Sequence, residues 1–101
     1  MLKEIKGDSQ PVGKQHKPKP FTQHEFKFKK DDLVVLFTDG YADQFGGPNG
    51  KKLKSKVFKE QIAIYSTENI SYVRKNVEDI FVKWKGSHEQ VDDVLVVGIK
   101  I

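Results

Sequence analysis

The residues of this chain best suited to chemistry are four aspartates that lie beside two strongly apolar segments. Asp39 follows the run LVVLF after a single threonine, and Asp43 lies four residues further on. Asp92 and Asp93 directly precede the second run, VLVVGIKI. Carboxylates held close together repel one another, and a hard cation such as Mg²⁺ or Mn²⁺ relieves that repulsion. This pattern indicates a candidate divalent-cation site, provided that the fold brings the aspartates together.

Both apolar runs, residues 33–37 and 94–101, are predicted to be strands in the middle of a sheet, because the first is apolar without interruption and the second nearly so. If the two strands are antiparallel neighbours, the end of the first and the beginning of the second lie at the same edge. Adjacent strands are ~4.8 Å apart, so Asp39 and Asp92 would then lie within several Å of each other.

The residues alone leave other readings open. Asp-Gly is an ordinary turn dipeptide, and an aspartate pair can open a strand without binding anything. Tyr41 and Phe45, beside the acidic loop, could line a substrate groove or pack beneath the loop. The three histidines lack the spacing of a zinc site and are expected at the surface. No serine or threonine has a base motif that would support covalent catalysis.

Two amphipathic helices are predicted between the central strands. The first covers residues 56–65, with Ser55 as its N-cap. The second covers residues 70–84, with Thr67 as its N-cap and a glycine at 86 as its stop. Trp84 belongs to the apolar stripe of the second helix and is expected in the core.

The remaining segments are simpler. Leu2 and Ile5 could anchor a short edge strand, and residues 24–29 alternate apolar with polar side chains as a strand covered on one face does. The glycine-rich segment 45–50 is predicted to turn without a regular element.

The length and composition of the chain exclude several classes of protein and site. The chain has 101 residues, the size of one small domain, and contains no cysteine, so disulfides, thiolate metal sites and cysteine nucleophiles are excluded. No apolar run approaches the ~20 residues that cross a bilayer, and the N-terminus has no apolar core of a signal peptide. We therefore expect a cytoplasmic location and no membrane contact by this segment.

The net charge of +4 is unevenly distributed. Lysines concentrate in residues 1–30 and 51–60, whereas residues 31–50 hold four aspartates and no basic residue. Lysines can bind nucleic acid by neutralising phosphates, but the chain has a single arginine, Arg74, and arginine is the residue that reads bases. The lysines are better explained as a solvated surface, and no nucleic-acid partner is expected.

The order of these blocks resembles a known family. The segment KKDDLVVLFTDGYADQFGGPNGKK, followed by two helices and VDDVLVVGIKI, is similar to the C-terminal half of SpoIIE-type phosphatases, the bacterial branch of the metal-dependent type 2C protein phosphatases. Upstream, IKGDSQPVG resembles the glycine-containing loop that precedes this region in the family. The resemblance covers nearly the whole chain.

The resemblance implies an α/β fold of the α+β kind: part of a four-layer α-β-β-α sandwich with mainly antiparallel sheets, and a binuclear Mg²⁺ or Mn²⁺ centre at one sheet edge. Asp39 and Asp92 match metal-ligand aspartates of the family. Asp93 occupies the adjoining position, and Asp43 is similar to an acidic residue that helps to hold an additional metal in some members. The implied reaction is hydrolysis of phosphoserine or phosphothreonine by metal-activated water.

The chain also departs from the family. A complete domain is roughly twice as long, and its first half supplies a metal-bridging aspartate and an acidic Asp-Gly pair that have no counterpart here. Residues 1–101 are therefore expected to be a single partial domain that binds metal weakly or not at all and is inactive alone. The implied partner of the longer protein is a phosphorylated, anti-anti-sigma-like regulatory protein. The alternative is a non-catalytic interaction module, and an exposed sheet edge could also support a homodimer.

Overall fold

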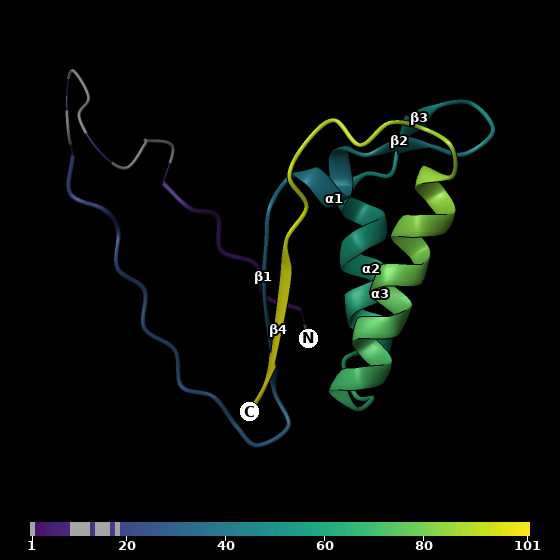
Figure 1. The fold of residues 1–101 in the computed structure, drawn as a ribbon. Coiled ribbons are helices and arrows are strands. Elements are labelled where there is room, and N and C mark those ends of the chain that lie inside the picture. The colour runs from purple at the N-terminus through teal and green to yellow at the C-terminus, as the bar shows by residue number, and fades with distance from the viewer. Residues whose placement is uncertain (1, 9–12, 14–16, 18) are drawn as a thin grey trace.

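A computed structural model of the chain describes residues 2–8, 13, 17 and 19–101. The elements are, in order, β1 (Leu33–Phe37), α1 (Gly40–Asp43), β2 (Phe45–Gly46), β3 (Lys51–Lys52), α2 (Ser55–Tyr65), α3 (Ile70–Lys85) and β4 (Val96–Lys100). Figure 1 shows the two long helices, α2 and α3, lying along the ribbon formed by β1 and β4. Residues 19–30, which precede β1, run apart from this body for most of their length (Figure 1).

The main sheet is formed by the first and last strands. β1 pairs with β4 in antiparallel orientation, with Leu33 opposite Lys100 and Phe37 opposite Val96. The prediction of two apolar strands as antiparallel neighbours, separated in sequence by two helices, is confirmed. The mixed α/β class with small antiparallel sheets is confirmed as well.

The core lies between one face of this sheet and the helices. Its buried members come from α1, α2, α3 and the segment before α2: Tyr41, Leu53, Phe58, Ile62, Val73 and Val77. Aromatic rings join the layers, since the Phe58 ring centroid lies 4.7 Å from those of both Phe37 and Tyr41. Each large apolar side chain buried in this way contributes about 1.5–3 kcal/mol to folding, so the amphipathic stripes of the helices account for their position on the sheet.

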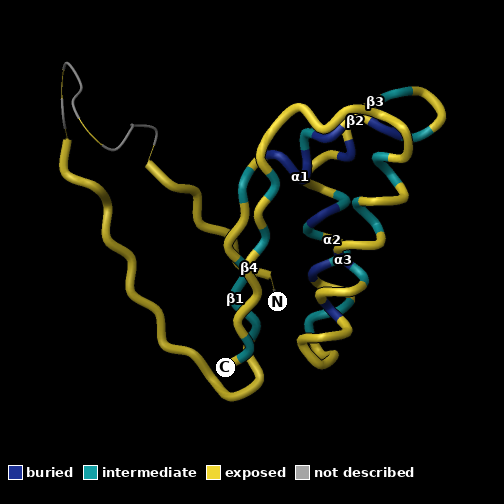
Figure 2. Tube along the Cα trace, in the orientation of Figure 1, coloured by how far each residue is buried: buried dark blue, intermediate teal, exposed yellow. Residues whose placement is uncertain are grey.

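The prediction that both strands lie in the middle of a sheet is wrong for the described part of the chain, where this sheet has two strands. Leu36 on β1 is 59% exposed and Leu95, just before β4, is 58% exposed, and Figure 2 shows exposed stretches along both segments. A continuous apolar run indicates that both faces of a strand are apolar. It does not supply the partner that would cover the second face.

Helix α3 ends as predicted but begins with a different cap. The side chain of Asn69 accepts a hydrogen bond of 2.9 Å from the amide of Tyr72, so Asn69 is the N-cap and Thr67 is not. Asn69 directly precedes the first helical residue, which is the position that a capping side chain needs. At the other end, Gly86 adopts a φ of 51° and stops the helix.

Helix α2 begins at Ser55 itself, so the prediction of Ser55 as N-cap is wrong. Lys54 occupies the cap position with a φ of 80°. Two main-chain hydrogen bonds hold this entry against the segment after β1: Leu53 N–H donates to Gln44 O at 2.9 Å, and Lys54 N–H donates to Ala42 O at 2.8 Å. These tertiary bonds, rather than a capping side chain, set the start of α2.

The glycine-rich segment forms a small hairpin, contrary to the prediction of no regular element. β2 pairs with β3, with Phe45 opposite Lys52. The turn between them uses Gly47 and Gly50, whose φ values of 69° and 60° favour glycine. Gly46 is required for packing, because a Cβ atom there would stand 1.8 Å from the carbonyl oxygen of Trp84.

The two strands predicted near the N-terminus are absent from the described residues. Leu2 and Ile5 are 49% and 44% exposed and belong to no strand. Residues 24–29 also lie outside regular structure, although the rings of Phe26 and Phe28 stack with centroids 6.2 Å apart. Alternation of apolar and polar side chains is not sufficient for a strand, which also needs a hydrogen-bonding neighbour.

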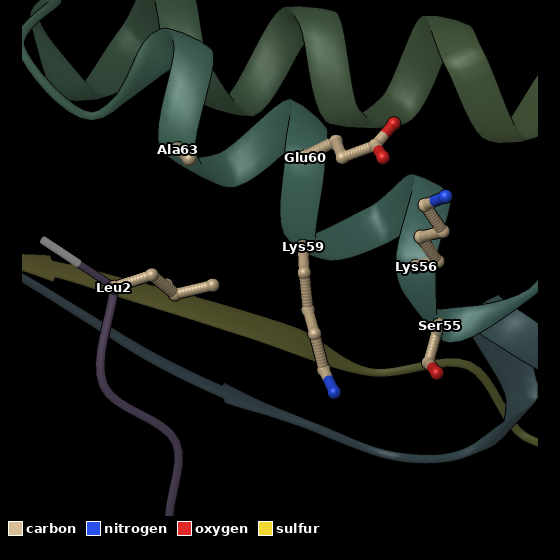
Figure 3. A pocket seen from close by; sticks show the side chains of 6 residues that line it. All are labelled: Leu2, Ser55, Lys56, Lys59, Glu60 and Ala63. Atoms are coloured by element: carbon tan, nitrogen blue, oxygen red, sulfur yellow. The ribbon is translucent and has the colours of Figure 1, made fainter.

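The N-terminal segment does contact the body of the protein at α2. Glu4 forms an ion pair with Lys59. Beside this pair lies an open pocket between Leu2 and the outer side of α2 (Figure 3), lined by Leu2, Ser55, Lys56, Lys59, Glu60 and Ala63. With one carboxylate in its lining, this pocket is not a second acidic cluster.

Across the described ranges, neither α2, α3 nor any other helix is long and apolar enough to cross a membrane.

Candidate metal centre

The candidate centre is the edge of the main sheet where β1 ends and β4 begins; we call residues 38–40 and 92–95 the acidic rim. The antiparallel register brings these two segments together although more than fifty residues separate them in sequence. The amide of Thr38 donates to the carbonyl oxygen of Leu95 at 3.0 Å, which continues the ladder one residue past Phe37. Asp39 therefore leaves the sheet at the edge where the Asp92-Asp93 pair enters it.

The hydroxyl of Thr38 also crosses the acidic rim. It donates to the carbonyl oxygen of Asp93 at 2.9 Å and accepts from the amide of Leu95 at 3.0 Å. The sequence pattern alone assigns this threonine no role. A threonine that stands between the last residue of a strand and an Asp-Gly turn is the signal that could have identified it.

Gly40 completes the contact between the two segments. A Cβ atom at Gly40 would stand 2.2 Å from the carbonyl oxygen of Asp93 and 3.0 Å from Cγ2 of Val94. The first of these neighbours is backbone and cannot move aside cheaply. Glycine is thus required at position 40 by close approach of the opposite segment, and not by its own conformation.

The carboxylates of the acidic rim have different surroundings. Asp39 is exposed and precedes α1 without a side-chain capping bond, and its carbonyl accepts from the amide of Asp43 at 2.9 Å. Asp92 is exposed, and its carboxylate accepts from the amide of Asp93 at 2.8 Å. Local structure therefore occupies one carboxylate oxygen of Asp92, while its second oxygen has room for another partner.

Asp43 lies one helical turn beyond the acidic rim. Its carboxylate is 3.7 Å from the ammonium group of Lys52 on β3, and both side chains are about half exposed. An exposed pair of this kind contributes about 0–1 kcal/mol to stability. Lys52 of the hairpin is thus the positively charged partner of Asp43. The sequence pattern did not indicate this pairing.

The side chains of the acidic rim are of the type that a hard cation prefers, but there are too few of them to form a complete site. The candidate ligand side chains of the rim are carboxylates, which suit Mg²⁺ or Mn²⁺. Among the described residues, however, no group of three or more His, Cys, Asp or Glu side chains is arranged to hold a metal ion. What the structure brings together is the backbone that carries Asp39, Asp92 and Asp93, which amounts to one side of a site.

Tyr41 and Phe45, which could line a substrate groove or pack beneath the acidic loop, differ in their surroundings. Tyr41 is 2% exposed and packs in the core, where it also lines an apolar pocket with Val73 and Val77. Phe45 is 41% exposed, with the Lys52 ammonium 5.9 Å from its ring centroid. Trp84 packs against the core, and its indole N–H donates to the carbonyl oxygen of Gln44 at 3.0 Å.

The other candidate groups lie away from metal chemistry. His24 and His88 are exposed, as expected, and His16 lies outside the described residues. Residues 9–12 of the glycine-containing N-terminal block also lie outside the described residues. Within the described part of this block, Asp8 accepts hydrogen bonds from the amide and the hydroxyl of Thr22. These two bonds, the amide first, hold the pKa of Asp8 below its usual value.

Comparison with known proteins identifies the group to which this fold belongs. The SiaA-PP2C domain of Pseudomonas aeruginosa has a similar structure, with a TM-score of 0.64 and 23% sequence identity. The match covers 68% of this chain and 28% of that domain, so the chain spans less than a third of the relative's length. A search of curated proteins finds no significant relative. Residues 2–101 match the family described as Stage II sporulation protein E (SpoIIE), and this chain therefore belongs to the SpoIIE family.

Proposed function

We propose that the chain is the C-terminal half of a Mg²⁺- or Mn²⁺-dependent protein serine/threonine phosphatase domain. Membership of the SpoIIE family and the PP2C-like fold support a phosphatase domain. The observation that most favours the metal-dependent reading is the pair of hydrogen bonds from Thr38 to Asp93 and Leu95, because they join the segment carrying Asp39 to the segment carrying Asp92.

In this proposal Asp39 and Asp92 are the principal ligands, Asp93 is an adjoining carboxylate, and Asp43 joins when an additional cation is held. When bound, the metal would acidify water and neutralise phosphoryl charge. The chain's own part is to hold negative charge at a fixed rim. For Asp43 to take part, its exposed contact with Lys52 must open, and the small free energy of such pairs allows this.

The proposed substrate is phosphoserine or phosphothreonine on a regulatory protein of the anti-anti-sigma kind, acted on by the longer protein. The short coverage of the solved relative supports a partial domain. With carboxylates from one side only, we expect this chain to bind the cation weakly and, alone, to hydrolyse little or nothing.

The experiment is a hydrolysis assay on the longer protein that carries this segment, using a phosphoserine peptide with Mn²⁺. Asp39→Asn and Asp92→Asn should each lower kcat/KM by at least roughly a hundredfold, since loss of a metal-binding carboxylate removes charge stabilisation of the transition state. Asp79→Asn, which changes an exposed aspartate on α3, is the matched control and should be neutral. Full activity in the Asp39 variant would overturn the assignment.

A second candidate is a non-catalytic interaction module with the same half-fold. It is favoured by the absence of a three-ligand group within the described residues and by the apolar outer face of the main sheet. That face includes Leu36 and Ile99, which are 59% and 46% exposed. Homodimer formation through the open edge and outer face of this sheet belongs to the same proposal. Absence of hydrolysis in the same assay, together with stable self-association, would favour this candidate.

A further inference from the structure

We propose that Thr38 is a positioning residue whose hydroxyl sets the spacing of the acidic rim. The inference rests on the proposed function, because it concerns how the rim is prepared for a cation. It goes beyond the ligand assignment, since Thr38 contributes no ligand in this account. Its role follows from the two hydrogen bonds that one hydroxyl makes across the sheet edge.

The pairing of Thr38 with Leu95 departs from a regular ladder. In antiparallel sheets, two residues in a hydrogen-bonded pair exchange both main-chain bonds, so the amide of Leu95 would normally donate to the carbonyl of Thr38. Here the Thr38 amide donates to Leu95 O at 3.0 Å as usual, but the Leu95 amide donates to the Thr38 hydroxyl at 3.0 Å. The side chain has replaced the main-chain acceptor.

This replacement lets the chain turn without losing its hold on β4. Because the hydroxyl accepts the Leu95 amide, the carbonyl of Thr38 need not point across the ladder. The main chain can then leave the strand at Asp39 and enter α1 at Gly40. The same hydroxyl donates to the carbonyl of Asp93 at 2.9 Å, so both segments are held at the point where one turns away and the other arrives.

Gly40 allows the two segments of the acidic rim to approach each other closely. Its missing side chain lets α1 begin against the carbonyl of Asp93, the same oxygen that accepts from Thr38. The positions of Asp39 and of the Asp92-Asp93 pair therefore depend on one shared acceptor and two hydrogen bonds. We expect that without the hydroxyl, the Leu95 amide loses its acceptor and the segment carrying Asp39 is no longer held against the rim.

The test uses the full chain, labelled with ¹⁵N, in three variants besides wild type. Thr38→Val removes the hydroxyl while keeping the shape, and Thr38→Ser restores it. Thr67→Val makes the same threonine-to-valine change at an exposed turn position and serves as the matched control. Two quantities are measured: hydrogen exchange of the Leu95 amide, and selective broadening of the Asp39 and Asp93 amide signals by added Mn²⁺.

In wild type, Thr38→Ser and Thr67→Val, we expect a protected Leu95 amide and selective Mn²⁺ broadening at the acidic rim. In Thr38→Val, the Mn²⁺ concentration needed for the same broadening should rise roughly fivefold or more, the effect of losing a hydrogen bond of ordinary strength. Hydrogen exchange of the Leu95 amide reports directly on its bond to the Thr38 hydroxyl. We expect this exchange to be faster in Thr38→Val and to return to the wild-type rate in Thr38→Ser.

The outcomes separate this inference from the proposed function. Selective broadening that Thr38→Val leaves unchanged would overturn the positioning role and leave the metal site standing. An unprotected Leu95 amide in wild type would also overturn the positioning role. No selective broadening in wild type would overturn the proposed metal site, and the inference with it. If Thr38→Val unfolds, the test rests on Thr38→Ser. This variant must match wild type in both Leu95 amide exchange and Mn²⁺ broadening, and failure in either would overturn the positioning role.

Discussion

The phenol of Tyr41 donates a hydrogen bond of 2.7 Å to the main-chain carbonyl of Val77, thirty-six residues away in the middle of α3. Tyr41 is the second residue of α1, which begins immediately after Asp39, and its side chain is 2% exposed. Its ring centroid lies 4.7 Å from that of Phe58 on α2 and 5.3 Å from that of Phe81 on α3. The segment that carries Asp39 is thus anchored to both long helices.

Removing this hydroxyl should destabilise the protein modestly. For Tyr41→Phe we expect a loss of about 1 kcal/mol in the free energy of unfolding, because a buried hydrogen bond is lost while the ring is kept. Urea unfolding followed by circular dichroism measures it. Tyr72→Phe, at a tyrosine that is 47% exposed, is the control and should change stability little. Equal effects of the two variants would contradict the anchoring role.

Tyr41 should also make stability fall at high pH. Burial raises the pKa of Tyr41 to about 12, from 10.0. The unfolded phenol ionises near pH 10 and the folded one near 12, so the folded state binds more protons between these values and stability decreases as pH rises through that window. The loss of stability across this window is on the order of 2 kcal/mol.

Comparison of wild type with Tyr41→Phe isolates this effect, because the lysines titrate in both proteins. The measurement is the free energy of unfolding at about pH 9 and about pH 12. Wild type should lose stability relative to the phenylalanine variant over that interval. Parallel pH profiles would show that Tyr41 is not buried as described.

Helix α2 offers a matched pair for the core. Ile62 is 6% exposed and packs in the core, whereas Ile64, two residues later on the same helix, is 63% exposed. Ile62→Val should cost about 0.5–1.5 kcal/mol, the range for deleting one buried methyl group. Ile64→Val should stay within about 0.5 kcal/mol of wild type. Thermal or urea unfolding of both variants measures the difference, and a reversed order would place the core on the other side of α2.

The apolar outer face of the sheet leads to a prediction about self-association. If copies pair through this edge and face, Leu36→Lys should weaken the association by roughly tenfold or more, because it removes apolar burial and places lysine on an edge strand. Val82→Lys, on α3 at the same 59% exposure, is the control. Sedimentation at several concentrations decides. A monomer at every concentration, or equal weakening by both variants, would count against the dimer.

The sequence was sufficient for features that depend on periodicity and order. The apolar runs of β1 and β4 and the 3.6-residue stripe of α3 were predictable, because each follows from side-chain spacing. The antiparallel pairing of the two strands was a condition of the predicted cation site, and the structure meets it. Gly86 as the end of α3 was predictable for the same local reason. These elements already bring Asp39 and Asp92 to one edge.

Features that depend on a distant partner could not be predicted. The alternation at residues 24–29 is typical of a strand, but strand formation requires a neighbour that the described chain does not provide. The start of α2 is set by hydrogen bonds from residues 53 and 54 to Gln44 and Ala42, which no local pattern reveals. The role of Thr38 depends on Leu95 and is invisible until β1 and β4 are paired.

The central claim is that Asp39 and Asp92 together attract a hard cation, and Mn²⁺ titration monitored by electron paramagnetic resonance tests it most directly. The free-ion signal is followed in wild type, Asp39→Asn, Asp92→Asn and the control Asp79→Asn. We predict weak, saturable uptake by wild type and by the control, and its loss in both rim variants. Equal uptake by all four proteins, or uptake by none, would contradict the account.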